Sequence, residues 1–246
     1  MASTRFLRLR SMKWLKSPVV MPRGKRVYAI GDVHGCAEKL RELHAQIRAD
    51  LTENPTSGAL LIHLGDFIDR GPDSAGAIEL AMRFDACPVV NLRGNHEATL
   101  LAALDGDAPS ATDWMYYGGR EALVSWGLAE HAPRESWATG IPAPHLEFLR
   151  ALTLSHRVGP YFFVHAGVRP GVPLDAQAPD DLMRIRGAFL DSEADHGAFI
   201  VHGHTPVRER VADLRENRIN LDTGAVFGGV LTCGVFEEDR IGLLTA

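Results

Sequence analysis

Five glycine-rich motifs, each placed directly after a short apolar run, constrain the fold of this 246-residue chain most strongly. The apolar runs are rich in β-branched and aromatic residues and are bounded by glycine, which is the pattern of buried strands. The predicted strands are 27–30, 59–64, 88–92, 161–164 and 199–201. The motifs that follow them are GDVHG at 31–35, GDFIDRG at 65–71, GNHE at 94–97, HAG at 165–167 and HGH at 202–204.

Helix-like segments join the first three predicted strands. The segment 37–50 carries Leu40, Leu43 and Ile47 at helical spacing, and 74–84 repeats this apolar pattern. Alternation of strands and helices is typical of an α/β fold. In such folds the ligand site lies beyond the carboxyl ends of the strands. The sequence therefore predicts an α/β fold in which the five motifs meet at one site.

The rest of the chain is predicted to complete a single domain over 27–246. The segment from about 100 to 157 contains none of the motifs and is predicted to form a helical layer beside the site. Near the C-terminus, 218–232 is predicted to form a strand, a glycine turn and a second strand, and 236–244 a further strand. Three aromatic residues of the helical layer are assigned to packing rather than to a substrate groove: Trp114, Tyr116 and Tyr117.

Residues 1–26 form a basic N-terminal arm without an acidic side chain. With a net charge of −5 overall, the rest of the chain is strongly acidic, which argues against a nucleic-acid partner and suits a site for metal cations. The arm is predicted to fray or to pack on the domain. The alternative is an amphipathic helix in weak contact with an anionic membrane surface.

No secretory signal, spanning segment or disulfide framework is predicted. The arm lacks the apolar core of a secretory signal, and no apolar run reaches the length of a transmembrane helix. The cysteines Cys36, Cys87 and Cys233 are far apart and form no CxxC pair. Reduced thiols in a cytoplasmic protein are the prediction.

The motifs supply carboxylate, imidazole and amide groups but no thiolate. This mixture of ligands suits Mn²⁺, Fe, Zn²⁺ or Mg²⁺ rather than a soft metal. Two such cations about 3.5–4 Å apart need a bridging carboxylate, and they can activate a water while neutralising a phosphoryl group. The candidate ligands are Asp32, His34, Asp66, Asn95, His165 and His204.

The remaining polar residues of the motifs fit phosphoryl transfer. Arg70, Arg93 and Arg186 can meet phosphate oxygens with a planar fork of N–H donors. His96 has the pKa range needed to protonate a leaving alkoxide. Asp69 could hold and charge-stabilise that imidazole.

In this order, the five motifs resemble those of the phosphoprotein phosphatase family of calcineurin-like metallophosphoesterases, in its short bacterial and phage form. The resemblance covers about 27–232, and RGNHE, GDFIDRGP and VHGHTP are specific when found together. It implies a four-layer α/β/β/α sandwich with two central mixed sheets. It also implies two divalent metal ions, with Mn²⁺ favoured over Fe, Zn²⁺ and Mg²⁺.

The resemblance assigns a role to each candidate residue. The metal ligands are Asp32 and His34 for the first ion, Asp66 as the bridge, and Asn95, His165 and His204 for the second ion. The catalytic and phosphate-binding residues are His96 as the general acid, Asp69 as its partner, and Arg70, Arg186 and, more weakly, Arg93.

Three functions are compatible with this set of residues. The favoured one is a phosphomonoesterase acting on phosphoserine and phosphothreonine in proteins or peptides, with phosphotyrosine as an extension. The alternative is a nucleotide hydrolase resembling the symmetrical diadenosine tetraphosphatases, which typically lack the aspartate of DRG and carry GNHD. Asp69 and Glu97 therefore favour the phosphatase. An inactive phosphopeptide-binding scaffold would lack a ligand, yet every ligand position is filled. The oligomeric state stays open.

Several neighbouring polar residues have competing interpretations. His202 precedes His204 by two residues, and the metal role is assigned to His204. His63 lies inside a predicted strand and is interpreted as a hydrogen-bonded core histidine. Asp222 fits either a position behind the metal ligands or the start of a tight turn. Glu97 is predicted to cap or orient a helix.

Overall fold

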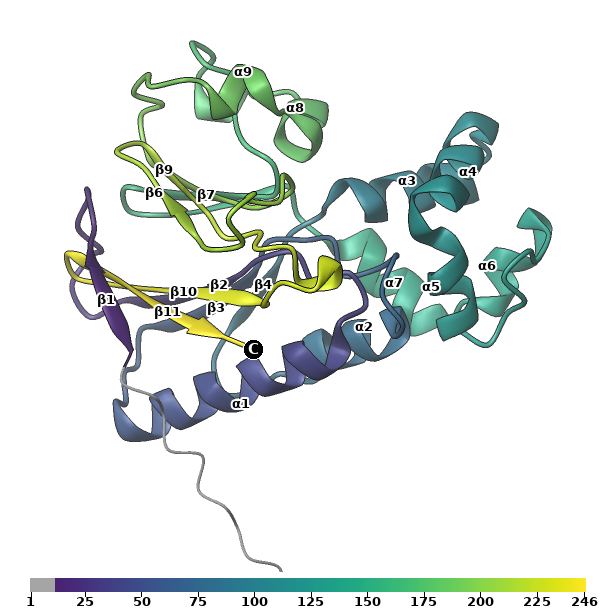
Figure 1. The fold of residues 1–246 in the computed structure, drawn as a ribbon, viewed down its shortest axis with the longest axis horizontal. Coiled ribbons are helices and arrows are strands. Elements are labelled where there is room, and N and C mark those ends of the chain that lie inside the picture. The colour runs from purple at the N-terminus through teal and green to yellow at the C-terminus, as the bar shows by residue number, and fades with distance from the viewer. Residues whose placement is uncertain (1–11) are drawn as a thin grey trace, which may run out of the picture.

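The described chain is residues 12–246 of a computed structural model, and two β-sheets face each other within it (Figure 1). Their strand orders are β1-β11-β10-β2-β3-β4 and β5-β6-β7-β9-β8. The strands of the first sheet are β1 (Lys13–Lys16), β2 (Arg26–Ile30), β3 (Ala59–His63), β4 (Val89–Asn91), β10 (Thr232–Glu237) and β11 (Arg240–Thr245). The strands of the second sheet are β5 (Ser155–Val158), β6 (Tyr161–Val164), β7 (Phe199–His202), β8 (Asp213–Leu214) and β9 (Arg218–Asn220).

Helices lie outside both sheets, so the layers run helix, sheet, sheet, helix (Figure 1). Against the first sheet lie α1 (Ala37–Glu53) and α2 (Ser74–Arg83), and beyond the second lie α8 (Pro179–Arg184) and α9 (Gly187–Leu190). The remaining helices gather at one end of the molecule: α3 (Asn95–Leu104), α4 (Ala108–Trp114), α5 (Arg120–Ser125), α6 (Trp137–Gly140) and α7 (Ala143–Ala151). The predicted four-layer fold is confirmed.

Both sheets are mixed, with parallel strands at their centres. In the first sheet β2, β3 and β4 run parallel and β10 pairs antiparallel with β2, while in the second β6, β7 and β9 run parallel. Successive side chains of β2 alternate between two cores. Val27 and Ala29 face the second sheet, whereas Tyr28 and Ile30 pack against α1. Covering on both faces explains why these strands read as continuous apolar runs.

Aromatic side chains fill the space between the sheets. The ring of Phe236 on β10 lies 5.3 Å from that of Tyr161 and 5.7 Å from that of Phe163, both on β6. Such edge-to-face pairs add roughly 0.5–1.5 kcal/mol each beyond the burial of their apolar area. This contact fixes one sheet against the other, and so it fixes the strand ends that carry the motifs.

The predicted strands that precede the motifs are confirmed to within two residues at either end. The motif-free segment also contains the predicted helices, interrupted by a π-helical turn at Met115–Gly119. It ends earlier than expected, because β5 begins at Ser155.

The C-terminal prediction is right in its sequence of strand, glycine turn and strand but wrong in its bounds, because the second strand begins only at Thr232. Residues 218–232 form no hairpin, because β9 belongs to the second sheet and β10 to the first. The chain crosses between the sheets through a 3₁₀ turn, Ala225–Phe227, flanked by Gly224 and Gly228 at φ of 69° and 82°. The next strand then begins at Arg240 rather than at 236, since β10 continues to Glu237.

The second half of the basic arm is part of the first sheet. Strand β1 pairs antiparallel with β11, and the guanidinium of Arg240 stacks on the ring of Trp14 at 4.2 Å. The helical alternative is therefore wrong for Lys13–Lys16. Residues 1–11 of the basic arm lie outside the described residues, and with them the rest of the helical alternative.

The structure of residues 12–246 also bears on membrane-spanning helices and on the state of the cysteines. None of the helices there combines the length and apolar character that a bilayer crossing requires. The cysteines Cys36, Cys87 and Cys233 are free thiols, as predicted.

Candidate functional site

The structure brings the predicted metal ligands together at the carboxyl ends of strands from both sheets. Asp32 and His34 follow β2, Asp66 follows β3, and Asn95 begins α3 just after β4. The residues contributed by the second sheet are His165 after β6 and His204 after β7. Two clusters of buried donor atoms, each spanning less than 4.8 Å, share Asp66: one adds His34 and His96, the other His165 and His204.

Asp66 lies at the centre of the site. Its Oδ2 atom is 3.5 Å from His34 Nε2 and 3.4 Å from His165 Nε2. Its Oδ1 atom accepts a hydrogen bond of 3.1 Å from the backbone N–H of His96. One carboxylate thus stands between imidazoles from the two sheets, which is the geometry that a bridging ligand requires.

Hydrogen bonds on the far side of each imidazole orient its ring. His34 Nδ1 lies 2.9 Å from the carbonyl oxygen of Ile68, and His165 Nδ1 lies 2.9 Å from that of Leu64. A carbonyl oxygen only accepts, so each Nδ1 carries a hydrogen, and Nε2 is the nitrogen that can bind a cation when the ring is neutral. His204 Nε2 is buried without a hydrogen-bond partner among the described residues. An orphaned imidazole nitrogen beside other ligands is suited to a cation.

Glu97 shapes the loop that carries Asp66. Its carboxylate accepts hydrogen bonds from the backbone N–H groups of Gly94 and Asp66 at 2.9 Å and of Phe67 at 2.7 Å. The bond to Gly94 caps α3, and the others tie the preceding loop to the same helix. The prediction that Glu97 caps and orients a helix is confirmed. Gly94 itself is required, because a Cβ there would collide with the Asp66 carboxylate.

Several site residues adopt left-handed backbone conformations. Residues other than glycine rarely adopt this conformation. Those that do are concentrated at functional sites, where the surrounding structure holds the backbone in place. The residues concerned are His34, Asp66, Asp69, Arg70 and His204, with φ between 42° and 74°. This conformation turns the chain sharply at the strand ends and aims the side chains back into the site.

The site concentrates buried carboxyl groups. The carboxylates are Asp32, Asp66, Asp69, Glu97 and Asp222, each less than 5% exposed. Burial and the charge of Asp222 raise the pKa of Asp32 well above its usual range. Burial alone would lower the pKa of His165, but Asp66 and Asp32 raise it to about 10. Buried charges persist when they are paired or bound to metals. The crowded carboxyl groups, whose ionisation calls for a compensating positive charge, the orphaned nitrogen and the hard ligand set together fit divalent cations.

His96 and Asp69 form a buried pair. His96 Nδ1 lies 2.6 Å from Asp69 Oδ2, and the other carboxylate oxygen accepts a 2.9 Å hydrogen bond from Trp114 Nε1. Burial lowers the pKa of His96 to about 4 and, with the charge of Asp66, raises the pKa of Asp69 well above its usual range. Because the two groups are in direct contact, they titrate as a unit.

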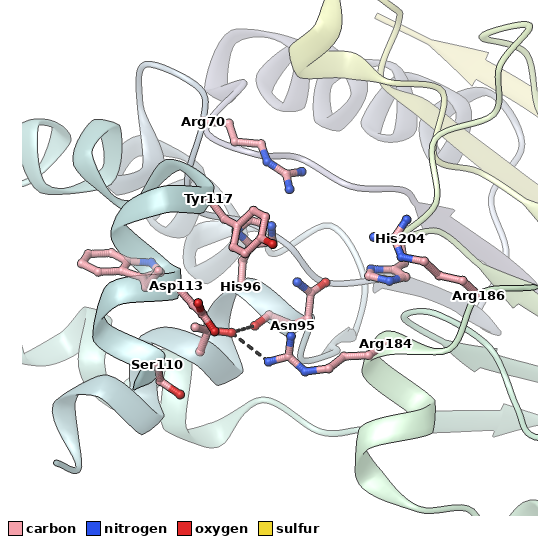
Figure 2. Close-up of a pocket in the computed structure, with 11 residues that line it drawn as sticks. Arg70, Asn95, His96, Ser110, Asp113, Tyr117, Arg184, Arg186 and His204 are labelled. Atoms are coloured by element: carbon pink, nitrogen blue, oxygen red, sulfur yellow. Dashed lines mark hydrogen bonds between the residues drawn. The ribbon is translucent and has the colours of Figure 1, made fainter. Parts of the chain in front are cut away.

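Of the three predicted phosphate-binding arginines, Arg70 and Arg186 lie at the pocket beside the ligand cluster and Arg93 does not. Arg70 and Arg186 line a pocket of about 280 Å³ beside the ligand cluster (Figure 2). Arg70 Nη1 lies 2.7 Å from His34 Nε2, and its backbone is held by the carbonyl of Gly118. Arg93 is absent from the described lining of this pocket, and its Nη2 donates instead to the carbonyl of Arg150 at 2.9 Å.

Sequence reasoning missed part of the pocket wall. Ser110 and Asp113 come from the motif-free helical layer, where no local pattern marks them. The assignment to packing is wrong for Tyr116 and Tyr117, which are exposed, and Tyr117 lines the pocket, whereas Trp114 is buried. Arg184 precedes the predicted Arg186 by two residues, so the sequence RIR was a usable signal. The full described lining is Arg70, Asn95, His96, Thr99, Ser110, Asp113, Trp114, Tyr117, Arg184, Arg186 and His204.

The competing interpretations of His202, Asp222 and His63 can now be compared with the structure. His202 is fully buried with its ring edge-on to Phe189 at 5.0 Å, as expected for a core residue. Asp222 accepts a 3.0 Å hydrogen bond from the backbone of Gly224, which is the predicted turn, and its charge also acts on Asp32. His63 is the predicted hydrogen-bonded core histidine.

Such a fold, with a carboxylate shared by two histidine clusters beside a basic pocket, defines a metal-dependent phosphoesterase. The sequence pattern of the calcineurin-like phosphoesterases matches residues 25–231. The chain belongs to this family.

Relatives with different activities resemble the chain. It is 34% identical over 222 residues to serine/threonine-protein phosphatase 1 of Salmonella typhimurium, covering 85% of this chain and 90% of the relative. It is 27% identical over 208 residues to a symmetrical bis(5'-nucleosyl)-tetraphosphatase of Nitrosospira multiformis, covering 78% and 66%. The crystal structure of a cold-active protein-tyrosine phosphatase from a psychrophilic Shewanella has the same fold, with a TM-score of 0.60, 18% identity and coverage of 93% and 83%.

Proposed function

We propose that the chain is a serine/threonine protein phosphatase, extending to phosphotyrosine, that hydrolyses phosphomonoesters of proteins or peptides in the cytoplasm. The observation that carries this proposal is the buried pair of His96 and Asp69 at 2.6 Å. The similarity to serine/threonine-protein phosphatase 1 over most of both chains supports it.

The pair matters because phosphoesters differ in their leaving groups. Serine and threonine leave as alkoxides, which are poor leaving groups unless an acid protonates them in the transition state. When a phosphoanhydride is cleaved, the leaving group is a phosphate, which needs far less protonation than an alkoxide. His96 lines the pocket, and because its Nδ1 is held by Asp69, Nε2 is the nitrogen left to meet a substrate. The residues that would supply a proton are therefore in place for the harder reaction.

Other residues of the chain would position the phosphoester. Arg70 and Arg186 can bind its non-bridging oxygens through their planar forks, because both line the same pocket as His96. Asp69 holds the imidazole with Nε2 facing the pocket, and Trp114 in turn holds Asp69. The leaving oxygen would then lie on the His96 side of the phosphate.

Two divalent metal ions complete the proposal, with Mn²⁺ as the favoured identity among Mn²⁺, Fe, Zn²⁺ and Mg²⁺, all of which suit carboxylate, imidazole and amide donors. Asp32 and His34 would hold the first, Asp66 would bridge, and the second would be held by Asn95, His165 and His204. When bound, such ions neutralise phosphate charge and lower the pKa of a coordinated water.

The second candidate is hydrolysis of a dinucleoside tetraphosphate. The observation in its favour is the similarity to a relative named for that activity. Asp69 and Glu97, which favour the phosphatase in the sequence, both make several hydrogen bonds that build the site. We therefore rank the nucleotide substrate second.

One experiment separates the two candidates. Wild type and His96→Asn are assayed with Mn²⁺ on a phosphoserine peptide, p-nitrophenyl phosphate and diadenosine tetraphosphate. The phosphatase proposal expects the highest wild-type kcat/KM on the peptide and a fall of about 10²–10⁴-fold in the variant. Turnover of p-nitrophenyl phosphate should fall much less, because nitrophenolate leaves without protonation.

The control is His131→Asn, which replaces an exposed histidine paired with Glu130 and should behave as wild type. Metal content is measured in each protein, so that loss of metal is not mistaken for loss of the acid. A strong preference for the dinucleotide, with peptide turnover near background, would replace the phosphatase proposal by the second candidate.

A further inference from the structure

We propose that Arg184 is a specificity-determining residue, which binds an acidic side chain next to the phosphorylated residue of a peptide substrate. The inference rests on the proposed function, because only a peptide substrate has such a neighbouring side chain. Arg184 is the last residue of α8 and lines the pocket together with Arg186 (Figure 2).

The side chain of Arg184 is anchored at two of its nitrogens. Nε lies 3.2 Å from Asp180 Oδ1 one helical turn earlier, and Nη2 donates a 2.8 Å hydrogen bond to Thr99 Oγ1. The Thr99 hydroxyl donates in turn to the carbonyl oxygen of Asn95 at 2.7 Å. A guanidinium has five N–H donors, and Nη1 of Arg184 makes no hydrogen bond within residues 12–246. Its side chain is 42% exposed, so the remaining donors are accessible.

These contacts place Arg184 on the leaving-group side of the pocket. Thr99 lies one turn after His96 on α3, so the two side chains share a face of that helix. Through Thr99, Arg184 is tied to the helix turn that carries the proposed acid. Arg186 instead points to His204, on the opposite side of the pocket (Figure 2). A group beside Arg184 would therefore belong to the leaving group rather than to the transferred phosphate.

The charge of the pocket supports an anionic neighbour. Arg70 and Arg186 already offer two forks to a single phosphate. The guanidinium of Arg184, which keeps free donors, is therefore available to a second anionic group. Its planar fork matches a carboxylate, whereas Asp113 on the other wall would repel one. The exposed ring of Tyr117 offers an apolar surface along which an extended peptide can lie.

The test compares two phosphoserine peptides that are identical except for glutamates or alanines on both sides of the phosphoserine. The readout is the ratio of their kcat/KM values with Mn²⁺. Wild type should prefer the acidic peptide by about tenfold, the size of one hydrogen-bonded charge pair in a partly exposed site. Arg184→Ala should reduce the ratio to about one, and Arg184→Lys should retain part of it.

Two further variants sharpen the result. Thr99→Val keeps the shape of the side chain but removes the anchor of Arg184, so the ratio should fall between those of wild type and Arg184→Ala. The matched control is Arg83→Ala, which removes an exposed arginine from another i,i+4 pair, with Glu79, away from the pocket. Its ratio should equal that of wild type.

Each outcome decides something different. Hydrolysis of both peptides by wild type without a preference overturns the role of Arg184 but leaves the phosphatase intact. An equal loss on both peptides in Arg184→Ala assigns the arginine to pocket structure and overturns the inference. Background activity on both peptides, with turnover of diadenosine tetraphosphate, overturns the proposed function and the inference together.

Discussion

His63 and His44 show how a buried residue can be satisfied far from any catalytic role. Their Nε2 atoms lie 3.0 Å apart, and His63 Nδ1 lies 2.7 Å from the side-chain oxygen of Asn91. One nitrogen of each hydrogen-bonded pair must accept, so the His44–His63 contact requires that at least one of the rings is neutral. Burial lowers the pKa of His63 to about 4, against an ordinary value of 6.5.

This pair should make stability depend on pH. Below pH 6.5 the unfolded chain binds a proton at His63 that the folded chain binds only near pH 4, so the free energy of unfolding falls as pH falls. The contribution amounts to about 2 kcal/mol at pH 5. Urea unfolding at pH 7 and pH 5 should show a smaller loss for His63→Gln than for wild type. Identical losses would show that His63 does not couple to folding.

At the residue scale, a role could be predicted from the sequence where it depends only on neighbouring residues in the chain. His63 was predicted to be a hydrogen-bonded core residue because it interrupts an apolar strand. Its partner His44 could not be predicted, since the contact depends on how α1 packs on β3. The contact between Thr99 and Arg184 could not be predicted for the same reason, because their hydrogen bond joins helices that are distant in the sequence.

The helical layer reaches the site through α4 and the π-helical turn that follows it. Helix α4 ends at Trp114, whose indole N–H bonds to Asp69 Oδ1 at 2.9 Å and whose ring contacts Trp137 at 4.7 Å. The π-helical turn that follows contains Gly118 at φ 114°, and its carbonyl oxygen holds the backbone of Arg70. The layer thus supports the acid and one arginine at once.

Trp114→Phe tests the hydrogen bond while preserving most of the packing. Asp69 would lose a donor in a buried position, which costs about 1–3 kcal/mol of stability and loosens the hold on His96. We expect turnover of a phosphoserine peptide to fall more than turnover of p-nitrophenyl phosphate. The matched control is Trp137→Phe, which loses a hydrogen bond to Ala132 instead. Equal effects of both variants on the two substrates would contradict a link to the acid.

Elements were predictable where a regular pattern and a glycine boundary coincide. The strands before the motifs satisfy both conditions, and so do α1 and α2. Strand β1 does not, because it is a short edge strand whose partner, β11, lies at the other end of the chain. The sheet to which β9 and β10 each belong could not be predicted, because a glycine turn has the same sequence pattern whether it closes a hairpin or links two sheets.

At the scale of the whole molecule, one cluster joins both sheets. Ligands after β2 and β3 meet ligands after β6 and β7 around Asp66. Any cation bound there would hold the two sheets together and would neutralise mutual repulsion among the buried carboxylates. Metal binding and folding stability are therefore expected to be linked.

Removal of divalent cations should lower the melting temperature. A ligand present at 100 times its Kd stabilises the folded state by about 2.7 kcal/mol, provided that it does not bind the unfolded chain. Calorimetry after chelation, and again after addition of Mn²⁺, measures the loss and its recovery. His204→Asn should show a smaller recovery, because one ligand is missing. Equal melting temperatures with and without chelator would contradict a buried two-metal site.

The order of the first sheet has a consequence for synthesis. Strand β10 inserts between β11 and β2, so β2 keeps an unpaired edge until Thr232–Glu237 have been synthesised. Unpaired apolar edges are templates for aggregation, and long-range pairing makes such chains slow to fold. A nascent chain halted before residue 232 would expose this edge. The interval of exposure would therefore outlast the synthesis of His204, the last of the candidate metal ligands, and would close only when β10 is available.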